Sequence, residues 1–247
     1  MTEEELFRTL REAFQTIAAQ HQLQAEQVHI QSRTLSPEEA IGITVRKDFP
    51  ILTGKEQMLQ AEFMGSRGQA FTDAPAVFHG TLADVLALDL MGDSHARGLF
   101  IAALNAVMCH LGLAEHTVHC KNGQPEDCAL QAVAWVREHY GAPRIALVGY
   151  QPALLERLSE AFPLRVLDLN PDNVGQVRYG VTVEHGIDAL DEVVYDWAEL
   201  VLCTGSTLCN GTIVNYLGLD KDVVFFGTTA SGTAPILGLK RMCFCAE

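Results

Sequence analysis

Apolar residues in the first twenty positions recur every three or four residues, and charged residues lie between them. The positions on this apolar face are Leu6, Leu10, Phe14, Ile17 and Ala18. This spacing predicts an amphipathic helix over residues 3–20. We expect its apolar face to pack against the rest of the protein, so the helix is assigned a structural role.

The segment after this helix has the pattern of short strands followed by a polar loop. Apolar runs at residues 28–32 and 40–45 predict two strands, and residues 34–37 predict a turn between them. Residues 65–73 include two glycines and have no helical or strand period, which predicts a loop. Because loops often carry functional residues, this segment supplies three candidate binding residues. They are Gln69, Phe71 and Asp73.

Three helices are predicted in the middle of the chain. Helical spacing of apolar residues places them at residues 82–90, 94–111 and 125–140. Thr81 can cap the first of these helices, and Asp93 or Ser94 can cap the second. Gly112 is expected to end the second helix and Gly141 the third.

From residue 144 onward, apolar runs alternate with helical segments. The runs lie at residues 144–148, 164–167, 200–203 and 223–226. Such alternation predicts a parallel sheet with crossover helices. Up to residue 113, by contrast, strands precede helices. The chain is therefore expected to be an α/β protein with two domains, residues 1–113 and residues 114–247.

Three of these predicted strands lead directly into loops rich in glycine, threonine and serine. Right-handed crossovers bring the carboxyl ends of successive strands to one edge of a sheet, so the loops are expected to line one crevice. Their N–H groups and hydroxyls suit a phosphate, a carboxylate or another anion. The candidates are Gly149, Thr204, Gly205, Ser206, Thr207, Asn210, Gly211, Thr212, Gly227, Thr228 and Thr229. The alternative is that these are tight turns that only reverse the chain.

Asp168 is a separate candidate, because it follows the second strand of the predicted sheet. It lies 19 positions after Gly149, close to the spacing between a phosphate-binding turn and the acid that binds a ribose hydroxyl. The turn at Gly149 lacks the second and third glycines of that motif, which disfavours classical NAD binding. A turn-forming role for Asp168 is the alternative.

Charge and composition limit the classes of partner. The formal net charge of −14 opposes binding to nucleic acid, whose affinity depends on cationic contacts with phosphates. No apolar run approaches the roughly 20 residues of a membrane span, and the acidic N-terminus does not resemble a secretory signal. We therefore expect a cytoplasmic protein that binds neither nucleic acid nor membrane. The seven cysteines, an odd number, favour free thiols.

Residues 116–128 contain the densest group of metal-binding side chains in the chain. Its members include His119 and Cys120, which are the candidate ligands for a divalent or heavy metal ion. Their spacing matches no standard zinc motif. At the C-terminus, Cys243 and Cys245 could bind a soft metal, or could lie on one buried face of a strand.

Several of these segments together resemble a known family. They are residues 68–73, residues 102–107, the pair His119 and Cys120, residues 204–207 and residues 210–212. The chain is similar, over almost its whole length, to the putative heavy-metal chelation family of prokaryotic proteins. The resemblance implies a small α+β domain like the enolase N-terminal domain, followed by a Rossmann-like α/β domain. It also implies a site in the cleft between them, with Asn105, His119, Thr204, Ser206 and Asn210 among its positions.

Three hypotheses for function follow. The first is a protein that binds an anionic small molecule or a metal chelate in the interdomain cleft, in heavy-metal or metal-cofactor metabolism. The second is a transferase or lyase that uses a nucleotide-like cofactor, with Asp168 on a ribose hydroxyl. The third is a non-catalytic metal carrier. A homodimer is the expected assembly, because dimers are the commonest state of soluble oligomers.

Overall fold

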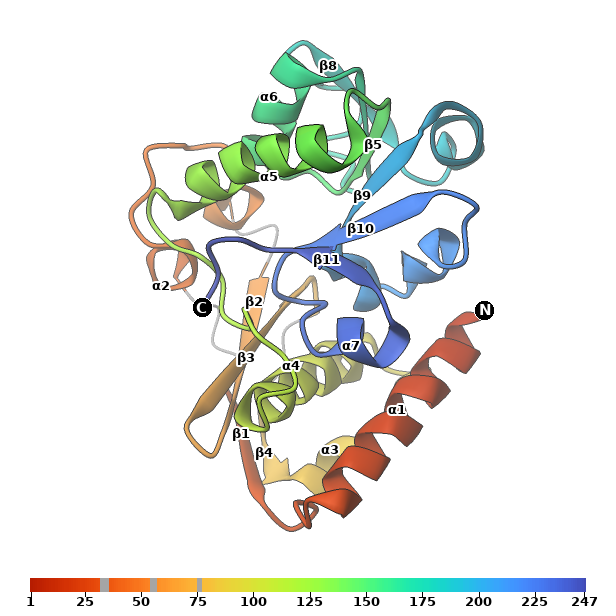
Figure 1. Cartoon of the computed structure of the whole chain (residues 1–247). Helices are drawn as coiled ribbons and strands as arrows, with labels where there is room; N and C mark the ends of the chain where they lie inside the picture. Colours follow the sequence, from red (N-terminus) through yellow and green to blue (C-terminus); the bar gives the residue numbers. More distant parts are fainter. Residues whose placement is uncertain (32–35, 54–56, 75–76) are drawn as a thin grey trace.

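The protein has two sheets, one antiparallel and one mostly parallel, with helices between and around them (Figure 1). A computed structural model describes residues 1–31, 36–53, 57–74 and 77–247. The α/β class predicted from the sequence is confirmed. Ser32 at the end of the first predicted strand, and the turn residues Thr34 and Leu35, lie outside the described residues.

The antiparallel sheet is built from the first third of the chain. Its strands are β1 (Gln27–Gln31), β2 (Gln57–Phe63), β3 (Ser66–Thr72) and β4 (Phe78–Thr81), in the spatial order β3-β2-β1-β4. The prediction of a loop over residues 65–73 is wrong, because most of this segment is β3. Gly68 does not mark a loop: a Cβ atom there would lie 2.2 Å from the backbone nitrogen of Ala106, so the glycine lets a helix approach the strand.

The predicted strand over residues 40–45 is also wrong. Residues Pro37–Ile41 form the short helix α2, and a 3-10 helix, η1 (Pro50–Thr53), follows it. Ser36 and Glu39 form a capping box at the start of α2, in which each side chain bonds to the other's backbone N–H. Gly42 then ends the helix with a φ of 71°. These signals for the start and end of a helix, at Ser36 and Gly42, determine the local structure. The short apolar run at residues 40–45 does not.

Three helices from the first 110 residues begin where the sequence predicts. They are α1 (Glu3–Gln20), α3 (Leu82–Leu86) and α4 (Ser94–His110). Thr81 caps α3 and Asp93 caps α4, although α3 is shorter than predicted. Helix α4 lies against β2 and β3, and every residue from Ala96 to Met108 is buried. It is enclosed on all sides, because the large sheet lies on its other flank.

The second sheet contains seven strands in the order β11-β10-β9-β5-β6-β8-β7. All its neighbouring strands are parallel except β7 and β8. Its strands are β5 (Ile145–Val148), β6 (Leu164–Asp168), β7 (Val177–Arg178), β8 (Val181–His185), β9 (Leu200–Thr204), β10 (Asp222–Phe226) and β11 (Lys240–Met242). Its helical segments are α5 (Gln124–Tyr140), α6 (Pro152–Ala161), the π-helical η2 (Asp191–Trp197), the 3-10 helices η3 (Gly205–Leu208) and η4 (Thr212–Tyr216), and α7 (Thr233–Leu237).

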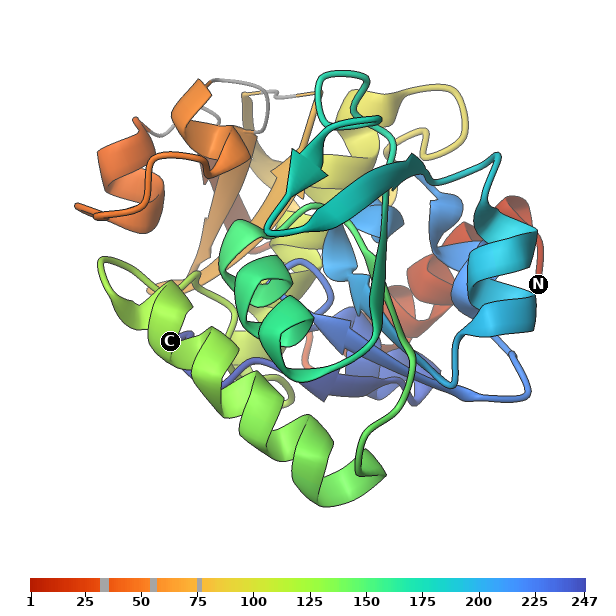
Figure 2. The same cartoon turned by 90° about the horizontal axis from the view of Figure 1, so that it is seen from above.

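Alternate residues of each parallel strand face two different cores. Ile145 and Leu147 pack with α5 and α6 on one face, whereas Ala146 and Val148 face α1 and α4 on the other. Figure 2 shows α5 and α6 outside the large sheet, on the side away from α1. The sheet is therefore covered on both faces, as parallel sheets usually are. None of the helices in the described residues combines the length and the apolar character that a bilayer crossing requires.

Candidate functional site

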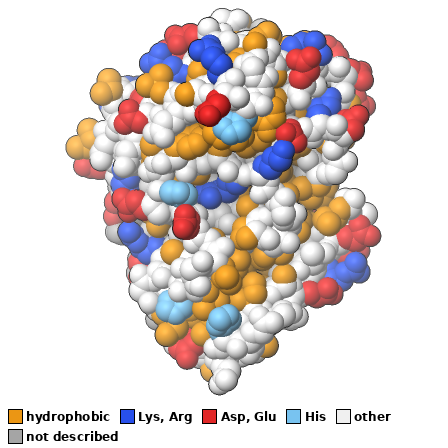
Figure 3. Space-filling view, in the orientation of Figure 1, with side chains coloured by type: hydrophobic (Ala, Val, Ile, Leu, Met, Phe, Trp, Pro, Cys, Tyr) orange, Lys and Arg blue, Asp and Glu red, His pale blue; other side chains and the backbone are white. Residues whose placement is uncertain are grey.

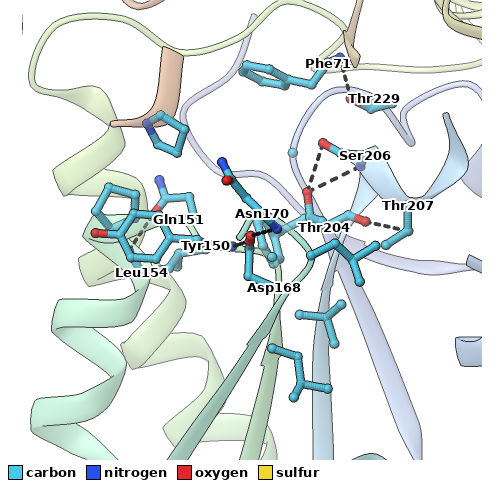
Figure 4. Close-up of a pocket in the computed structure, with 18 of the residues that line it drawn as sticks. Phe71, Tyr150, Gln151, Leu154, Asp168, Asn170, Thr204, Ser206, Thr207 and Thr229 are labelled. Carbon is cyan, nitrogen blue, oxygen red and sulfur yellow. Dashed lines mark hydrogen bonds between the residues drawn. The ribbon is translucent and has the colours of Figure 1, made fainter. Parts of the chain in front are cut away.

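A pocket of about 650 Å³ lies at the carboxyl edge of the parallel sheet (Figure 4). One wall is made by the residues that follow β5, β6, β9 and β10. The opposite wall comes from the first third of the chain, including Ile41, Phe49, Phe71 and Asp73. On the face of the molecule drawn in Figure 3, apolar side chains gather in the middle and charged ones lie mainly toward the rim.

The pocket brings together most of the candidate residues. Its lining includes Phe71, Asp73, Gly149, Asp168, Thr204, Ser206, Thr207, Asn210, Thr212, Gly227 and Thr229, with His119 and Cys120. Five candidates lie outside this lining. They are Gln69, Asn105, Gly205, Gly211 and Thr228.

Asn105 instead links the two sheets from a fully buried position. Its Nδ2 donates to the carbonyl oxygens of Gln69 (2.9 Å), Thr228 (3.1 Å) and Thr229 (3.1 Å). Its Oδ1 accepts from the backbone N–H of Gly232 at 2.7 Å. Asn105 therefore holds the Thr228–Thr229 loop against β3 and supports the pocket from behind.

Gln69 has a similar supporting role. Its Oε1 accepts from the backbone N–H of His119 at 2.7 Å, and its Nε2 donates to Oε1 of Gln60 at 2.8 Å. The side chain is buried, and these bonds position the segment that carries His119. The polar side chain of Gln69 within β3 is therefore explained by its bond to the segment that carries His119, and no ligand is needed to explain it.

Asp168 already accepts several hydrogen bonds from its own protein. Its Oδ2 accepts from the backbone N–H of Tyr150 and its Oδ1 from that of Asn170, both at 2.7 Å, and Nδ2 of Asn173 lies 3.3 Å from Oδ1. The carboxylate therefore joins the loops after β5 and β6, as the turn-forming alternative predicts. Little acceptor capacity remains for the two hydroxyls of a ribose.

Gly149 fits a close approach between two strand ends. It has a φ of 93°, and a Cβ atom there would lie 2.5 Å from Cγ2 of Thr204. Glycine is therefore needed for contact between the loops after β5 and β9, so this position requires no phosphate to explain it.

The loop after β9 differs from the predicted crossover helix, because two short 3-10 helices replace it. Its polar side chains bond to one another: Thr204 Oγ1 donates to Ser206 Oγ at 3.2 Å, and Thr207 Oγ1 donates to the Thr204 carbonyl at 2.7 Å. Asn210 Oδ1 accepts from both the N–H and the hydroxyl of Thr212. Ser206 accepts the bond from Thr204 and so keeps its own hydroxyl proton for a ligand.

The charge of the pocket lining is negative. Asp73 and Asp168 line it, and the described lining contains neither lysine nor arginine. Burial lowers the pKa of His119 to about 4, so its imidazole is neutral near pH 7. His119 Nδ1 lies 2.6 Å from the Cys120 carbonyl oxygen and must carry the ring proton, which leaves Nε2 with a lone pair. The ring also packs edge to face on Phe71.

The thiols near the pocket are protonated at neutral pH. Burial raises the pKa of Cys120, and it raises the pKa of Cys243 to about 11. Within the ranges that the structure describes, no three side chains of His, Cys, Asp or Glu are grouped so that they could hold a metal ion. The pocket wall therefore offers no preformed cage of several protein ligands for a bare ion.

Sequence reasoning missed the cover of the pocket, residues 46–53. Arg46 bonds to Glu126 through two nitrogens (2.5 and 3.0 Å), to Glu156, and to the Tyr179 hydroxyl at 2.5 Å. These partners, Glu126 first, raise the pKa of Arg46. Asp48 accepts from the hydroxyl of Tyr179 at 2.5 Å. No local pattern could identify this cover, because the side chains that hydrogen-bond to the Arg46 guanidinium are 80 to 133 positions away.

Comparisons with known proteins agree with the family resemblance. Residues 132–239 match the model of the family described as putative heavy-metal chelation. A crystal structure of a protein of unknown function from this family, from Pyrococcus horikoshii, aligns with a TM-score of 0.57 and 14% identity over 91% of this chain and 79% of that one. A family member of unknown function from Desulfitobacterium hafniense aligns with a TM-score of 0.46 and 13% identity, over 72% and 70% of the two chains. No curated protein matches the chain.

Proposed function

We propose that the protein binds a small metal chelate, uncharged or cationic, in the pocket between the two sheets. The observation that carries this proposal is the lining itself, which contains two carboxylates, neutral hydroxyls and apolar side chains but no lysine or arginine among the described residues. The family match to residues 132–239 supports a role connected with heavy metals.

The charge of the lining favours one of the two ligand classes expected from the sequence. A free polyanion would have to enter beside Asp73 and Asp168 with no cationic side chain to compensate, in a chain of net charge −14. Like charges at close range in a low dielectric oppose binding. A chelate, in which the metal neutralises the anionic groups of its organic ligand, avoids this cost.

The donor groups favour a chelate over a bare ion. A bound ion normally needs several protein ligands, and no such group of three is present among the described side chains. A chelated metal brings its own ligands, so the protein need only recognise the outer surface of the complex. Phe71 and Tyr150 offer aromatic faces for this purpose, and Ser206 offers a hydroxyl.

Mass measurement and variants test this function. Native mass spectrometry of the purified protein, compared with a denatured sample, is expected to show a bound mass that contains both a metal and an organic part. Asp73→Asn and Ser206→Ala should each reduce the occupied fraction. Asp196→Asn, an exposed residue remote from the lining, is the matched control and should leave it unchanged. Equal occupancy in Asp73→Asn, Ser206→Ala and the unaltered protein would overturn the proposal.

The other functional hypotheses remain predictions. A nucleotide-like cofactor held by Asp168 requires acceptor capacity that the carboxylate largely uses within the protein. An unchanged nucleotide affinity in Asp168→Ala would exclude that cofactor role. The non-catalytic carrier, the homodimer, the cytoplasmic location and the division at residues 113 and 114 are likewise expectations from the sequence.

A further inference from the structure

Three side-chain amides that line the pocket use their oxygen atoms and their nitrogen atoms differently. They belong to Gln151, Asn170 and Asn210, which lie in the loops after β5, β6 and β9. Each amide oxygen accepts a hydrogen bond from a backbone N–H a few residues along the chain. Among the described residues, none of the three amide nitrogens has a hydrogen-bonding partner. The acceptors of this group are therefore used within the protein, whereas its donors are not.

The local hydrogen bonds determine which end of each amide is left for the pocket. Gln151 Oε1 accepts from the backbone N–H of Leu154 at 2.5 Å and so caps the start of α6. Asn170 Oδ1 accepts from the backbone N–H of Asp172 at 3.0 Å. Only the oxygen of an amide can accept from an N–H, so the nitrogen occupies the other position. In Figure 4 both side chains extend from the carboxyl edge of the sheet into the space below Phe71.

The loop after β9 adds two further donors. Asn210 Oδ1 accepts from the N–H and the hydroxyl of Thr212, at 3.0 and 2.7 Å, which leaves Nδ2 without a partner among the described residues. The Ser206 hydroxyl accepts from Thr204 and retains its proton. Strands β9, β5 and β6 are neighbours in the sheet, so these donors form a row along its carboxyl edge.

Few acceptors are left along the same edge. The Asp168 carboxylate already accepts three hydrogen bonds from its own protein. Asp73 is exposed to solvent, and His119 lies on the opposite wall, where its ring packs on Phe71. The carboxyl edge therefore offers a ligand N–H and O–H groups that carry no positive charge.

We propose that Gln151, Asn170 and Asn210 select uncharged chelates whose outer surface carries oxygen acceptors. This inference rests on the proposed function and narrows the class of its ligand. Neutral N–H groups can satisfy oxygen lone pairs on a complex that has no net charge. A complex whose surface carries N–H groups would leave these donors unpaired, and an unpaired buried donor costs free energy. Such a complex is disfavoured even if its positive charge suits the acidic chain.

Two inert cobalt(III) chelates test this selectivity. Tris(acetylacetonato)cobalt(III) is uncharged and carries oxygen atoms on its surface, whereas tris(ethylenediamine)cobalt(III) is a cation that carries N–H groups. Cobalt(III) exchanges its ligands slowly, so neither complex transfers its metal to the cysteines. The full chain is dialysed to equilibrium against each complex, and cobalt is measured by atomic absorption. The acetylacetonate complex is expected to bind at least about tenfold more tightly.

Variants of the same shape reverse the donors and keep the local hydrogen bonds. Gln151→Glu, Asn170→Asp and Asn210→Asp each retain an oxygen for the backbone N–H and replace the amide nitrogen with a second acceptor. Each should weaken binding of the acetylacetonate complex about threefold to tenfold. Because this complex is uncharged, the loss reports the missing hydrogen bond. Gln176→Glu adds the same charge at an exposed position outside the lining and should leave the affinity unchanged.

Serine variants remove a donor without adding charge. In Gln151→Ser and Asn210→Ser, the hydroxyl can still accept the local backbone hydrogen bond, but it is too short to take the place of the amide nitrogen. We expect the same loss of affinity for the acetylacetonate complex as in the acidic variants. Circular dichroism and thermal unfolding check that each variant is folded.

The outcomes separate this inference from the proposed function. Equal affinity for the two complexes would overturn the selectivity. Unchanged binding of the acetylacetonate complex in all three acidic variants would overturn the assignment of the amides. In both cases chelate binding in the pocket would stand. Binding of neither complex would also overturn the inference, and native mass spectrometry of the purified protein then decides the proposed function on its own.

Discussion

The two walls of the pocket are held in place by different kinds of interaction. The wall at the edge of the parallel sheet is fixed by hydrogen bonds of buried groups, with Asn105 at their centre. Part of the opposite wall, residues 46–53, is held over the pocket by the charged and phenolic partners of Arg46 and Asp48. The difference indicates that the first wall is part of the core, whereas residues 46–53 can loosen without unfolding it.

Removing the Asn105 side chain should give the largest effect. Asn105→Ala leaves the Gly232 N–H and the carbonyls of Gln69 and Thr229 without this partner in a buried place, whereas the Thr228 carbonyl still accepts from Ser231. Unsatisfied buried groups of this kind cost about 1–3 kcal/mol each, so we expect a loss of at least about 3 kcal/mol in the free energy of unfolding. Chemical denaturation measures it. Asn215→Ala, at a partly buried position outside this network, is the control and should change stability far less.

Acid should lower the stability of the folded protein by favouring protonation of the buried His119 ring. Its pKa is lowered to about 4 from 6.5, so the folded state disfavours the protonated ring. The resulting stability is present above pH 6.5 and is lost as the pH falls from 6.5 toward 4, by about 3 kcal/mol. Unfolding measured at several pH values should show this slope, and His119→Gln should reduce it. The same change at the exposed His21 should have no such effect; an unchanged slope in His119→Gln would contradict the assignment.

Loosening residues 46–53 should lower the free energy of unfolding by a smaller amount. The effect should be confined to that segment. Arg46→Met keeps the apolar part of the side chain and removes its bonds to Glu126, Glu156 and Tyr179. Because these groups are partly exposed, we expect a loss of only about 1–2 kcal/mol. Hydrogen exchange should quicken in residues 46–53 but not in β5 or β9. Arg157→Met, which breaks an exposed ion pair with Glu160, is the control. Equal protection of residues 46–53 in both variants would show that the cover does not depend on Arg46.

Four strands of the second half could be predicted from sequence because their signals are local, whereas β7, β8, β11 and the 3-10 helices after β9 were not predicted. The apolar runs at β5, β6, β9 and β10, and Pro152 at the start of α6, act through near neighbours. The strands of the first half were predicted less well, for two reasons. Gly68 has the appearance of a loop residue until α4 is placed against it, which is a distant contact. Residues 40–45 have the apolar pattern of a strand, but a local signal, the capping box of Ser36 and Glu39, overrides it.

The candidate site could be predicted in part for the same reason. Loops at strand ends, such as that of Thr204, follow from topology alone. The supporting role of Asn105 and the cover held by Arg46 could not be derived, since both depend on partners more than thirty positions away. Polar residues such as Asn105 and Gln69 look alike in a sequence whether they face a ligand or a neighbouring backbone.

Helix α4 also determines how a ligand can enter. It is buried along almost its whole length, with the antiparallel sheet on one side and the core of the parallel sheet on the other. Opening the protein like a hinge would expose this helix to water, at a cost set by its apolar surface. The two sheets are therefore expected to move as a single rigid frame. Entry and release would then be gated locally, by displacement of residues 46–53.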